Sequence, residues 1–208
     1  METVLIFVLI FGLFAWGMYK LLRFTRNTVG ENSPLKVRRV YRISESKYFL
    51  SFDSLFVYFL AYFALHWTYI VAFVLPTSTI ADGVSLWPIY GISGLLLILL
   101  SSLAWYGLSL TFNYWKYTKN VSLCFDPETK TLRVTSDNGE QLIRDGDIES
   151  VEIVSNQNHK FYYGYYKFRL ADGNELILTE KTPGVWAIFE YFKELPRVYH
   201  KRRFPIIR

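Results

Sequence analysis

The stretch LFVYFLAYFALHWTYIVAFVL, residues 55–75, contains no Asp, Glu, Lys or Arg and decides the broad class of this chain. About 20 apolar residues cross the hydrocarbon core of a membrane, whereas a helix on a soluble protein needs a polar face. A second stretch, WPIYGISGLLLILLSSLAWYGLSLTF, covers residues 87–112 and is also uncharged. Because a helix satisfies its own backbone groups inside lipid, we predict transmembrane helices over residues 51–76 and 87–113, joined by a short loop at 77–86.

A third apolar stretch, VLIFVLIFGLFAWGMYKLL, lies at residues 4–22 and carries one charge, Lys20, which can extend to the headgroups. A cleaved signal peptide is the competing interpretation. A signal peptide has a basic leader and a small-residue cleavage site, but this stretch follows the acidic Glu2 and no such site comes after it. We therefore predict a retained transmembrane helix over residues 1–24.

The orientation of these helices follows from the basic residues in the loops, because Lys and Arg remain on the cytosolic side. Residues 77–86 contain no Lys or Arg, and Lys116 and Lys119 follow the last span. We predict a multi-pass protein of the inner (plasma) membrane, with the N-terminus outside, residues 25–50 in the cytosol, residues 77–86 outside and the C-terminal domain in the cytosol. The basic residues around the first cytosolic loop are Arg23, Arg26, Lys36, Arg38, Arg39, Arg42 and Lys47.

From residue 121 onward the apolar runs become short and alternate with polar residues, which is typical of β-strands. Asp137-Asn138-Gly139 and Asp172-Gly173 predict hairpin turns, because Asn-Gly and Asp-Gly accept the positive φ angles of tight turns. We expect an irregularity near Ser150. The predicted strands cover residues 121–125, 132–135, 141–144, 148–154, 161–170 and 175–179.

A helical period follows the last strand. Thr182 is a plausible N-cap, Pro183 fits the first helical position and Pro196 ends the helix. The chain is thus predicted to be an α+β membrane protein, with three transmembrane helices before a small antiparallel β domain, residues 121–196, that a C-terminal helix caps. The apolar positions of that helix are Val185, Ile188, Phe189, Phe192 and Leu195.

The β domain resembles the pleckstrin-homology-like (PH-like) domains of small bacterial membrane proteins. The resemblance is carried by Ile148-x-x-Val151-x-Ile153, by the Tyr-rich strand ending in Leu170-Ala171-Asp172-Gly173, by Leu176-Ile177-Leu178 and by the terminal helix. It covers a little over a third of the chain. It implies a docking or scaffold module and supplies no catalytic residues.

The sequence contains no catalytic motif of the hydrolase, nucleotide-binding or dinucleotide-binding kinds. A single cysteine, Cys124, excludes an internal disulfide and a cysteine-based zinc site, and three histidines leave little for a metal centre. We therefore predict a chain that is not an enzyme, with no catalytic residues, no metal and no cofactor.

Two polar residues in or beside the second span are candidate functional groups. His66 lies at membrane depth, where it can bind haem, relay a proton or bond Ser101, Ser102 or a backbone carbonyl of a neighbouring helix. Asp53 lies at the cytosolic end of this span, where a partner in the basic loop suffices. The small residues Ser101, Ser102, Ala104 and Gly107 of the third span favour close helix packing.

The β domain offers candidate interaction residues on its Tyr-rich strand and in the basic tail, residues 197–208. The aromatic run permits base stacking, but strand core and a protein-binding surface explain it better, so we predict no nucleic-acid partner. The tail suits an anionic membrane surface or an acidic partner, and a simply solvated tail is the alternative. The candidates are Tyr163, Tyr165, Lys167, Arg169, Lys201, Arg202 and Arg203.

These observations predict a non-enzymatic integral membrane scaffold or adaptor. Its cytosolic PH-like domain would dock a protein partner or the membrane surface. Its partners would be membrane lipids and other membrane subunits, with which it forms a homo- or hetero-oligomer. The alternative is a transport or redox component that uses His66.

Overall fold

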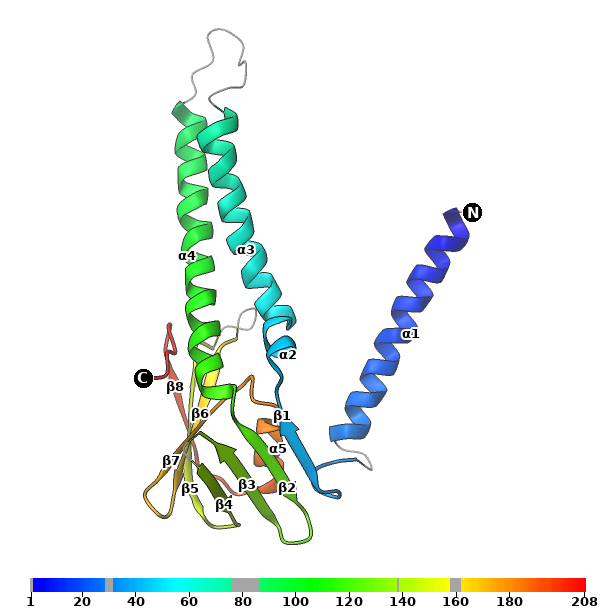
Figure 1. The fold of residues 1–208 in the computed structure, drawn as a ribbon, viewed down its shortest axis with the longest axis vertical. Helices are drawn as coiled ribbons and strands as arrows, with labels where there is room; N and C mark the ends of the chain where they lie inside the picture. The colour runs from blue at the N-terminus through cyan, green and yellow to red at the C-terminus, as the bar shows by residue number, and fades with distance from the viewer. Residues whose placement is uncertain (1, 29–31, 76–86, 138, 158–161) are drawn as a thin grey trace.

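The computed structural model describes residues 2–28, 32–75, 87–137, 139–157 and 162–208. It is a mixed α and β structure, in which a long helical hairpin rises from a small β lobe and helix α1 stands to one side (Figure 1). The predicted outside loop, residues 77–86, lies outside the described residues. The long uncharged stretches of the sequence form the helices of the hairpin, and the region of short alternating apolar runs forms the strands.

The hairpin is formed by α3 (Phe52–Tyr69), which continues into the π-helical segment η1 (Ile70–Val74), and by α4 (Trp87–Thr118). Among the described residues, these are the two helices long and apolar enough to cross a membrane, with mean hydropathies of 1.7 and 1.9. Only 11% and 22% of their most apolar windows are buried inside the protein. Their large apolar side chains therefore face outward, unlike those of a core helix in a soluble domain.

Helix α1 (Glu2–Thr28) is helical where the sequence predicted a helix, and it lies apart from the hairpin (Figure 1). It is not one of the two candidate spans found among the described residues. The prediction of three transmembrane helices is therefore reduced to two candidates.

The hairpin helices pack closely because small residues line their contact. Ala104 and Gly107 of α4 are buried, and a Cβ atom on Gly107 would lie 2.6 Å from Cγ2 of Val57 on α3. Ser101 and Ser102 are exposed instead, and Ser102 donates its hydroxyl to the carbonyl of Ile98. Close packing of small residues is thus confirmed at Ala104 and Gly107 and not at Ser101 and Ser102.

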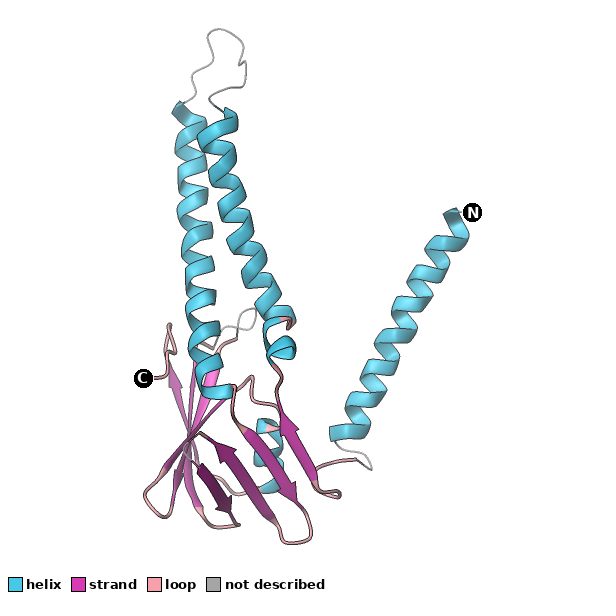
Figure 2. Ribbon diagram, viewed as in Figure 1, coloured by secondary structure: helices cyan, strands magenta, loops and turns pink. Residues whose placement is uncertain are grey.

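The lobe contains two four-stranded sheets, in the orders β1-β2-β3-β4 and β7-β6-β5-β8 (Figure 2). All pairs are antiparallel except β5 with β8. The six predicted strands are present, and the expected irregularity is a register shift between Ile148 and Ser150. They are β2 (Ser122–Asp126), β3 (Thr131–Ser136), β4 (Gly139–Ile143), β5 (Ile148–Ser155), β6 (Gly164–Leu170) and β7 (Glu175–Thr179).

Two further strands come from segments predicted as a loop and a tail, so residues 121–196 are too narrow a boundary for the lobe. Strand β1 (Arg39–Arg42) arises in the basic loop and β8 (Arg197–Lys201) in the basic tail. All five residues of β8 are exposed, so no apolar alternation marks it. In β1, Tyr41 is the residue that packs against the core.

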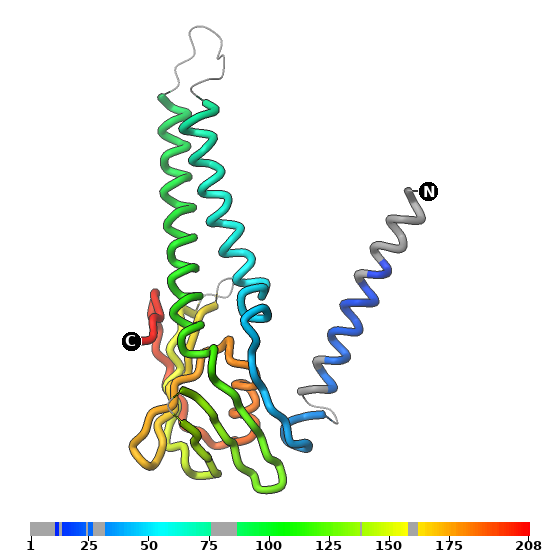
Figure 3. The backbone as a smooth tube through the Cα atoms, viewed as in Figure 1, coloured from blue at the N-terminus to red at the C-terminus, as the bar shows by residue number. Residues whose placement is uncertain are grey.

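The hairpin is inserted into the lobe between two neighbouring strands. The chain leaves β1 through the short helix α2 (Glu45–Phe49), rises along α3 and returns along α4 into β2 (Figure 3). All four residues of β1 then pair with β2, from Arg39 with Phe125 to Arg42 with Ser122. The two ends of the hairpin are therefore held by one ladder of backbone hydrogen bonds.

The lobe core lies between the two sheets and helix α5 (Val185–Tyr191), with Leu123, Phe125, Phe168 and Leu178 at most 1% exposed. The predicted N-cap was wrong. Gly184, with φ of 82°, occupies the cap, and Thr182 instead pairs its hydroxyl with Thr179 at 3.2 Å.

Candidate functional site

The base of the hairpin and the lobe share a buried junction of tyrosines and hydroxyl groups. Tyr48 of α2 is 1% exposed, and its hydroxyl donates to the carbonyl of Thr111 on α4 at 2.7 Å. The hydroxyl of Ser54 on α3 donates to the carbonyl of Tyr48 at 3.1 Å. Buried hydrogen bonds of this kind are costly to break, because each leaves an unpaired polar group. They fix α2 against both hairpin helices.

A second set of bonds joins α4 to strand β7 of the lobe. The hydroxyl of Thr118 donates to the carbonyl of Tyr114 at 2.8 Å, and it lies 2.6 Å from the hydroxyl of Thr179. Both threonines are fully buried. Thr179 ends β7 and precedes the connection to α5. The foot of α4 is therefore bonded to the segment that carries the residues of the cavity described below.

The C-terminal segment also docks on the hairpin. Asn113 of α4 donates its amide to the carbonyl of Ile207 at 3.0 Å and accepts the N–H of Ile207 at 2.9 Å. Tyr114 donates its hydroxyl to the carbonyl of Pro205 at 3.0 Å. Ile207 is 3% exposed. The end of the basic tail is thus packed against α4 and not solvated as a whole.

A cavity of about 630 Å³ opens beside this junction, at the foot of α3. Ligand sites commonly measure ~300–1,000 Å³, so this cavity can hold a small polar group. Its lining comes from α2, the start of α3, the approach to β6 and the residues after β7. The charged and aromatic lining residues are Lys47, Tyr48, Asp53, Tyr162, Glu180 and Lys181.

Lys181 is held by aromatic rings and a hydroxyl group. Its ammonium lies 5.0 Å from the ring centre of Tyr48 and 5.8 Å from that of Tyr163, and it donates to the hydroxyl of Ser54 at 3.4 Å. Ammonium groups are attracted to ring faces at such distances. Burial lowers the pKa of Lys181, while Asp53 and Glu180 act in the opposite direction.

One carboxylate oxygen of Glu180, Oε2, is a buried polar atom without a hydrogen-bond partner within the described part of the chain. Burial raises the pKa of Glu180 from its ordinary 4.5 to about 8, although Lys181 and a backbone hydrogen bond from Gly164 favour the charged form. The carboxyl group therefore keeps its proton near neutral pH unless a further donor or cation approaches it.

Of the two predicted polar residues of the second span, only Asp53 belongs to this site. It lines the cavity together with Lys47, which comes from the predicted basic loop. His66 lies on the exposed face of α3 and stacks on Tyr62, with ring centres 5.9 Å apart. The described contacts include no bond from His66 to Ser101 or Ser102.

The predicted interaction residues of the Tyr-rich strand are engaged within the protein. Tyr163 and Tyr165 are 3% and 8% exposed, so they do not form an outer surface. Lys167 pairs with Glu175 at 2.7 Å across the sheet, and Arg169 pairs with Glu152. The two tyrosines were predicted to be accessible, but they are buried because they pack against the hairpin, a contact that the sequence did not predict.

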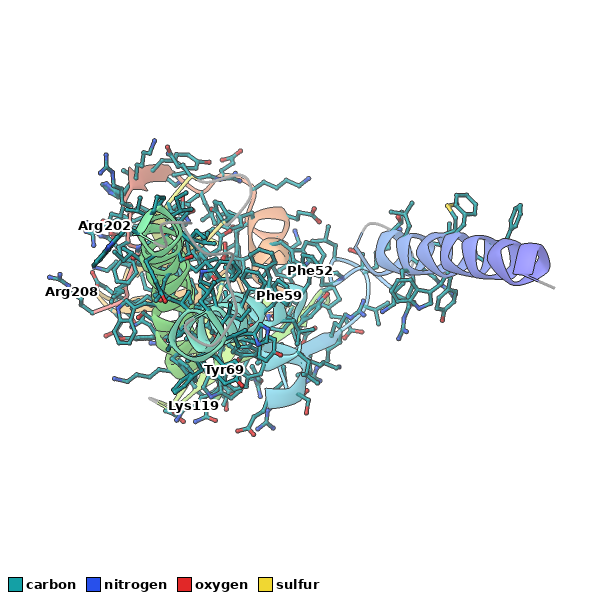
Figure 4. All side chains as sticks on the ribbon, turned by 90° about the horizontal axis from the view of Figure 1, so that it is seen from above. Phe52, Phe59, Tyr69, Lys119, Arg202 and Arg208 are labelled. Carbon is teal, nitrogen blue, oxygen red and sulfur yellow. The ribbon has the colours of Figure 1, made fainter. Side chains whose placement is uncertain are left out.

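The basic residues at the end of β8 and directly after it remain accessible. Lys201, Arg202 and Arg203 are exposed, and the hydroxyl of Tyr106 donates to the carbonyl of Arg203 at 2.8 Å. Viewed from above the hairpin, Arg202 and Arg208 lie on the side away from α1 (Figure 4).

Sequence reasoning missed Glu180, Lys181 and Tyr48 as site residues. The only available signal was a pair of charged residues directly after a predicted strand, which is common on protein surfaces. Within the described residues, no group of three or more His, Cys, Asp or Glu side chains is placed to hold a metal ion.

A small lobe of two sheets capped by a helix, with a polar cavity at its edge, has the architecture of a binding module. A family model described as PH domain matches residues 40–180, which is more than half of the chain and includes the inserted hairpin. The chain therefore belongs to the PH domain family. No curated protein and no solved structure matches it. PH domains are typically non-catalytic modules that bind proteins or lipids.

Proposed function

We propose that this chain is a non-enzymatic integral membrane protein that holds a PH domain at the cytosolic surface of the inner membrane. In this proposal α3 and α4 cross the membrane, α1 provides a further span, and the lobe docks a membrane-embedded protein partner or the lipid surface. The chain would act as a scaffold or adaptor subunit of a membrane assembly.

The observation that carries the proposal is the insertion of the apolar hairpin between β1 and β2. A domain tethered by a flexible linker can turn freely, but this lobe is joined to the hairpin through two strands and three sets of hydrogen bonds. If the hairpin spans the membrane, one face of the lobe must lie against the lipid surface.

The side chains at the foot of the hairpin support this placement. Leu50 and Phe52 are 66% and 83% exposed, although they lie at the junction with the lobe. Exposed apolar side chains beside basic ones are typical of a membrane interface, because the rings and chains enter the headgroup region while the cations meet anionic lipid. Lys47 and Arg42 supply such cations.

The alternative of transport or redox chemistry at His66 gains no support from the described residues, because the imidazole faces outward from the helix pair.

The proposal is tested with photo-crosslinking residues placed in the full chain inside cells. A crosslinker at Leu50 should capture lipid or a membrane-embedded protein, because Leu50 lies at the foot of the hairpin. The matched position is Glu128, which is exposed in the turn after β2 at the far end of the lobe. Equal capture at both positions, or extraction of the chain from membranes by alkaline carbonate, would contradict the proposal.

A further inference from the structure

The cavity at the foot of α3 combines opposite charges in a way that selects a particular kind of ligand. Lys47 and Lys181 contribute two cations, and Asp53 and Glu180 contribute two acidic groups. A ligand with only negative charge would meet the acidic pair, and one with only positive charge would meet the lysines. A zwitterion, with the two charges a few atoms apart, can face both pairs.

The buried oxygen of Glu180 specifies the cationic end of the ligand. Oε2 has no partner within the described part of the chain, and Lys181 directs its ammonium to Ser54 and to the rings of Tyr48 and Tyr163. A buried acceptor without a donor costs free energy, so a group that donates an N–H to it binds favourably. A primary ammonium can do this, whereas a quaternary ammonium has no N–H to donate.

Lys47 and Ser51, which also line the cavity, suit a phosphodiester. Lys47 is exposed on α2, and Ser51 is the N-cap of α3, a helix of 18 residues. Phosphate groups are stabilised by lysine side chains and by the backbone N–H groups at the start of a helix. The cavity thus presents the ammonium of Lys47 from α2 and a hydrogen-bond acceptor at Glu180.

We propose that this cavity binds the headgroup of an aminophospholipid, with its primary ammonium at Glu180 and its phosphodiester near Lys47. The inference rests on the proposed function, which places the foot of α3 at the level of the lipid headgroups. Binding of the ammonium replaces the proton of Glu180. The lining of the cavity does not include the exposed basic residues of β8 and the tail, which form no ion pair with an acidic residue in the described part of the chain.

The experiment is native mass spectrometry of the purified full chain in detergent, with equal amounts of phosphatidylethanolamine, phosphatidylcholine and phosphatidylglycerol of the same acyl chains. We expect about tenfold more ethanolamine lipid than choline lipid to remain bound, the effect of one hydrogen bond to a charged group. Equal retention of the ethanolamine and choline lipids would overturn the proposal, and so would preference for the anionic lipid.

The decisive variant is Glu180→Gln, with Glu149→Gln as its matched control on an exposed position of β5. Glu180→Gln should reduce ethanolamine-lipid retention to the level of the choline lipid, while Glu149→Gln should leave the preference intact. Glu180→Gln replaces a buried acid by a neutral group of the same shape, so the fold should persist, and circular dichroism verifies this. Unchanged selectivity in Glu180→Gln would overturn the assignment of the ammonium.

A third arm uses water-soluble phosphoethanolamine as a competitor. If the lipid is the ligand, millimolar competitor should displace it only partly, because the acyl chains remain in the micelle. Full binding of phosphoethanolamine with no retention of the lipid would overturn the lipid assignment. Loss of selectivity in a chain that still resists carbonate extraction refutes this inference alone, whereas carbonate extraction refutes the proposed function.

Discussion

Replacement of Gly107 by Ala tests the packing of the hairpin directly. The new Cβ atom would lie 2.6 and 2.9 Å from the two methyl carbons of Val57. Ordinary contact between carbon atoms is about 3.5–4.0 Å, so α3 and α4 must separate by about 1 Å or Val57 must change rotamer. A β-branched side chain in a helix has one strongly preferred rotamer, so separation is the expected response.

The magnitude follows from two opposing effects. Overpacking costs about 1–3 kcal/mol, and Gly→Ala in a helix returns about 1 kcal/mol of intrinsic propensity. Gly94→Ala on the same helix provides the control, because a Cβ atom there has no neighbour within 4 Å. The difference between the two variants therefore isolates the clash, and Gly107→Ala should be the less stable by about 1–3 kcal/mol.

The assay is an SDS titration of the detergent-solubilised full chain, followed by tryptophan fluorescence and circular dichroism. Adding Val57→Ala to Gly107→Ala removes both close methyl groups, so the double variant should lose less stability than the sum of the single variants. If Gly107→Ala equals or exceeds Gly94→Ala in stability, the contact between α3 and α4 is not as close as the structure shows.

Two further predictions concern the lobe. Gly184→Ala should destabilise it by about 2–4 kcal/mol, because the alanine must keep a positive φ and its Cβ atom lies 2.6 Å from the ring of Tyr41. Gly173→Ala is the control, because Gly173 shares the φ of 82° but a Cβ atom there has no neighbour within 4 Å. Thermal unfolding of Gly173→Ala should show a loss of only about 1–2 kcal/mol. The pKa of Glu180 is about 8 in the native state and 4.5 in an ordinary glutamate, so between these pH values the native state binds more protons than the unfolded state. The free energy of unfolding should therefore fall as the pH rises from about 5 to about 8. Glu180→Gln should flatten this slope in denaturant titrations, and a slope that persists in the variant would show that another group is responsible.

The hairpin and six of the strands were predictable from the sequence because burial in lipid and alternation on a sheet leave strong local patterns. The uncharged stretch at residues 55–75 permits few alternatives to a long apolar helix. The irregularity at Ser150 was also visible, since the apolar alternation changes phase there.

The remaining strands were not predictable for a physical reason. Strand β8 is exposed at every residue and pairs in parallel with β5, so its position depends on a long-range contact with no local signature. Strand β1 has four residues, and only Tyr41 packs against the core. Such segments become strands because the lobe provides an edge for them.

The cavity was not predictable for the same reason, because its residues are far apart in the sequence. Tyr48 and Lys181 are 133 positions apart in the chain and meet because the hairpin returns α4 into the strand next to β1. Tyr163 was predicted as an interaction residue because tyrosines are common at interfaces, but the hairpin covers it. The resemblance to PH-like domains placed the whole lobe after the helices, so the insertion of the hairpin between β1 and β2 was not predicted.

The membrane orientation is measured most directly by cysteine labelling from each side of the membrane. In a Cys124→Ser background, single cysteines replace Ser78 in the loop predicted to lie outside and Glu149 on the exposed surface of β5. An impermeant maleimide should modify position 78 in intact cells and position 149 only after the membrane is permeabilised. Modification of position 149 in intact cells, with protection of position 78, would contradict a PH domain held on the cytosolic surface.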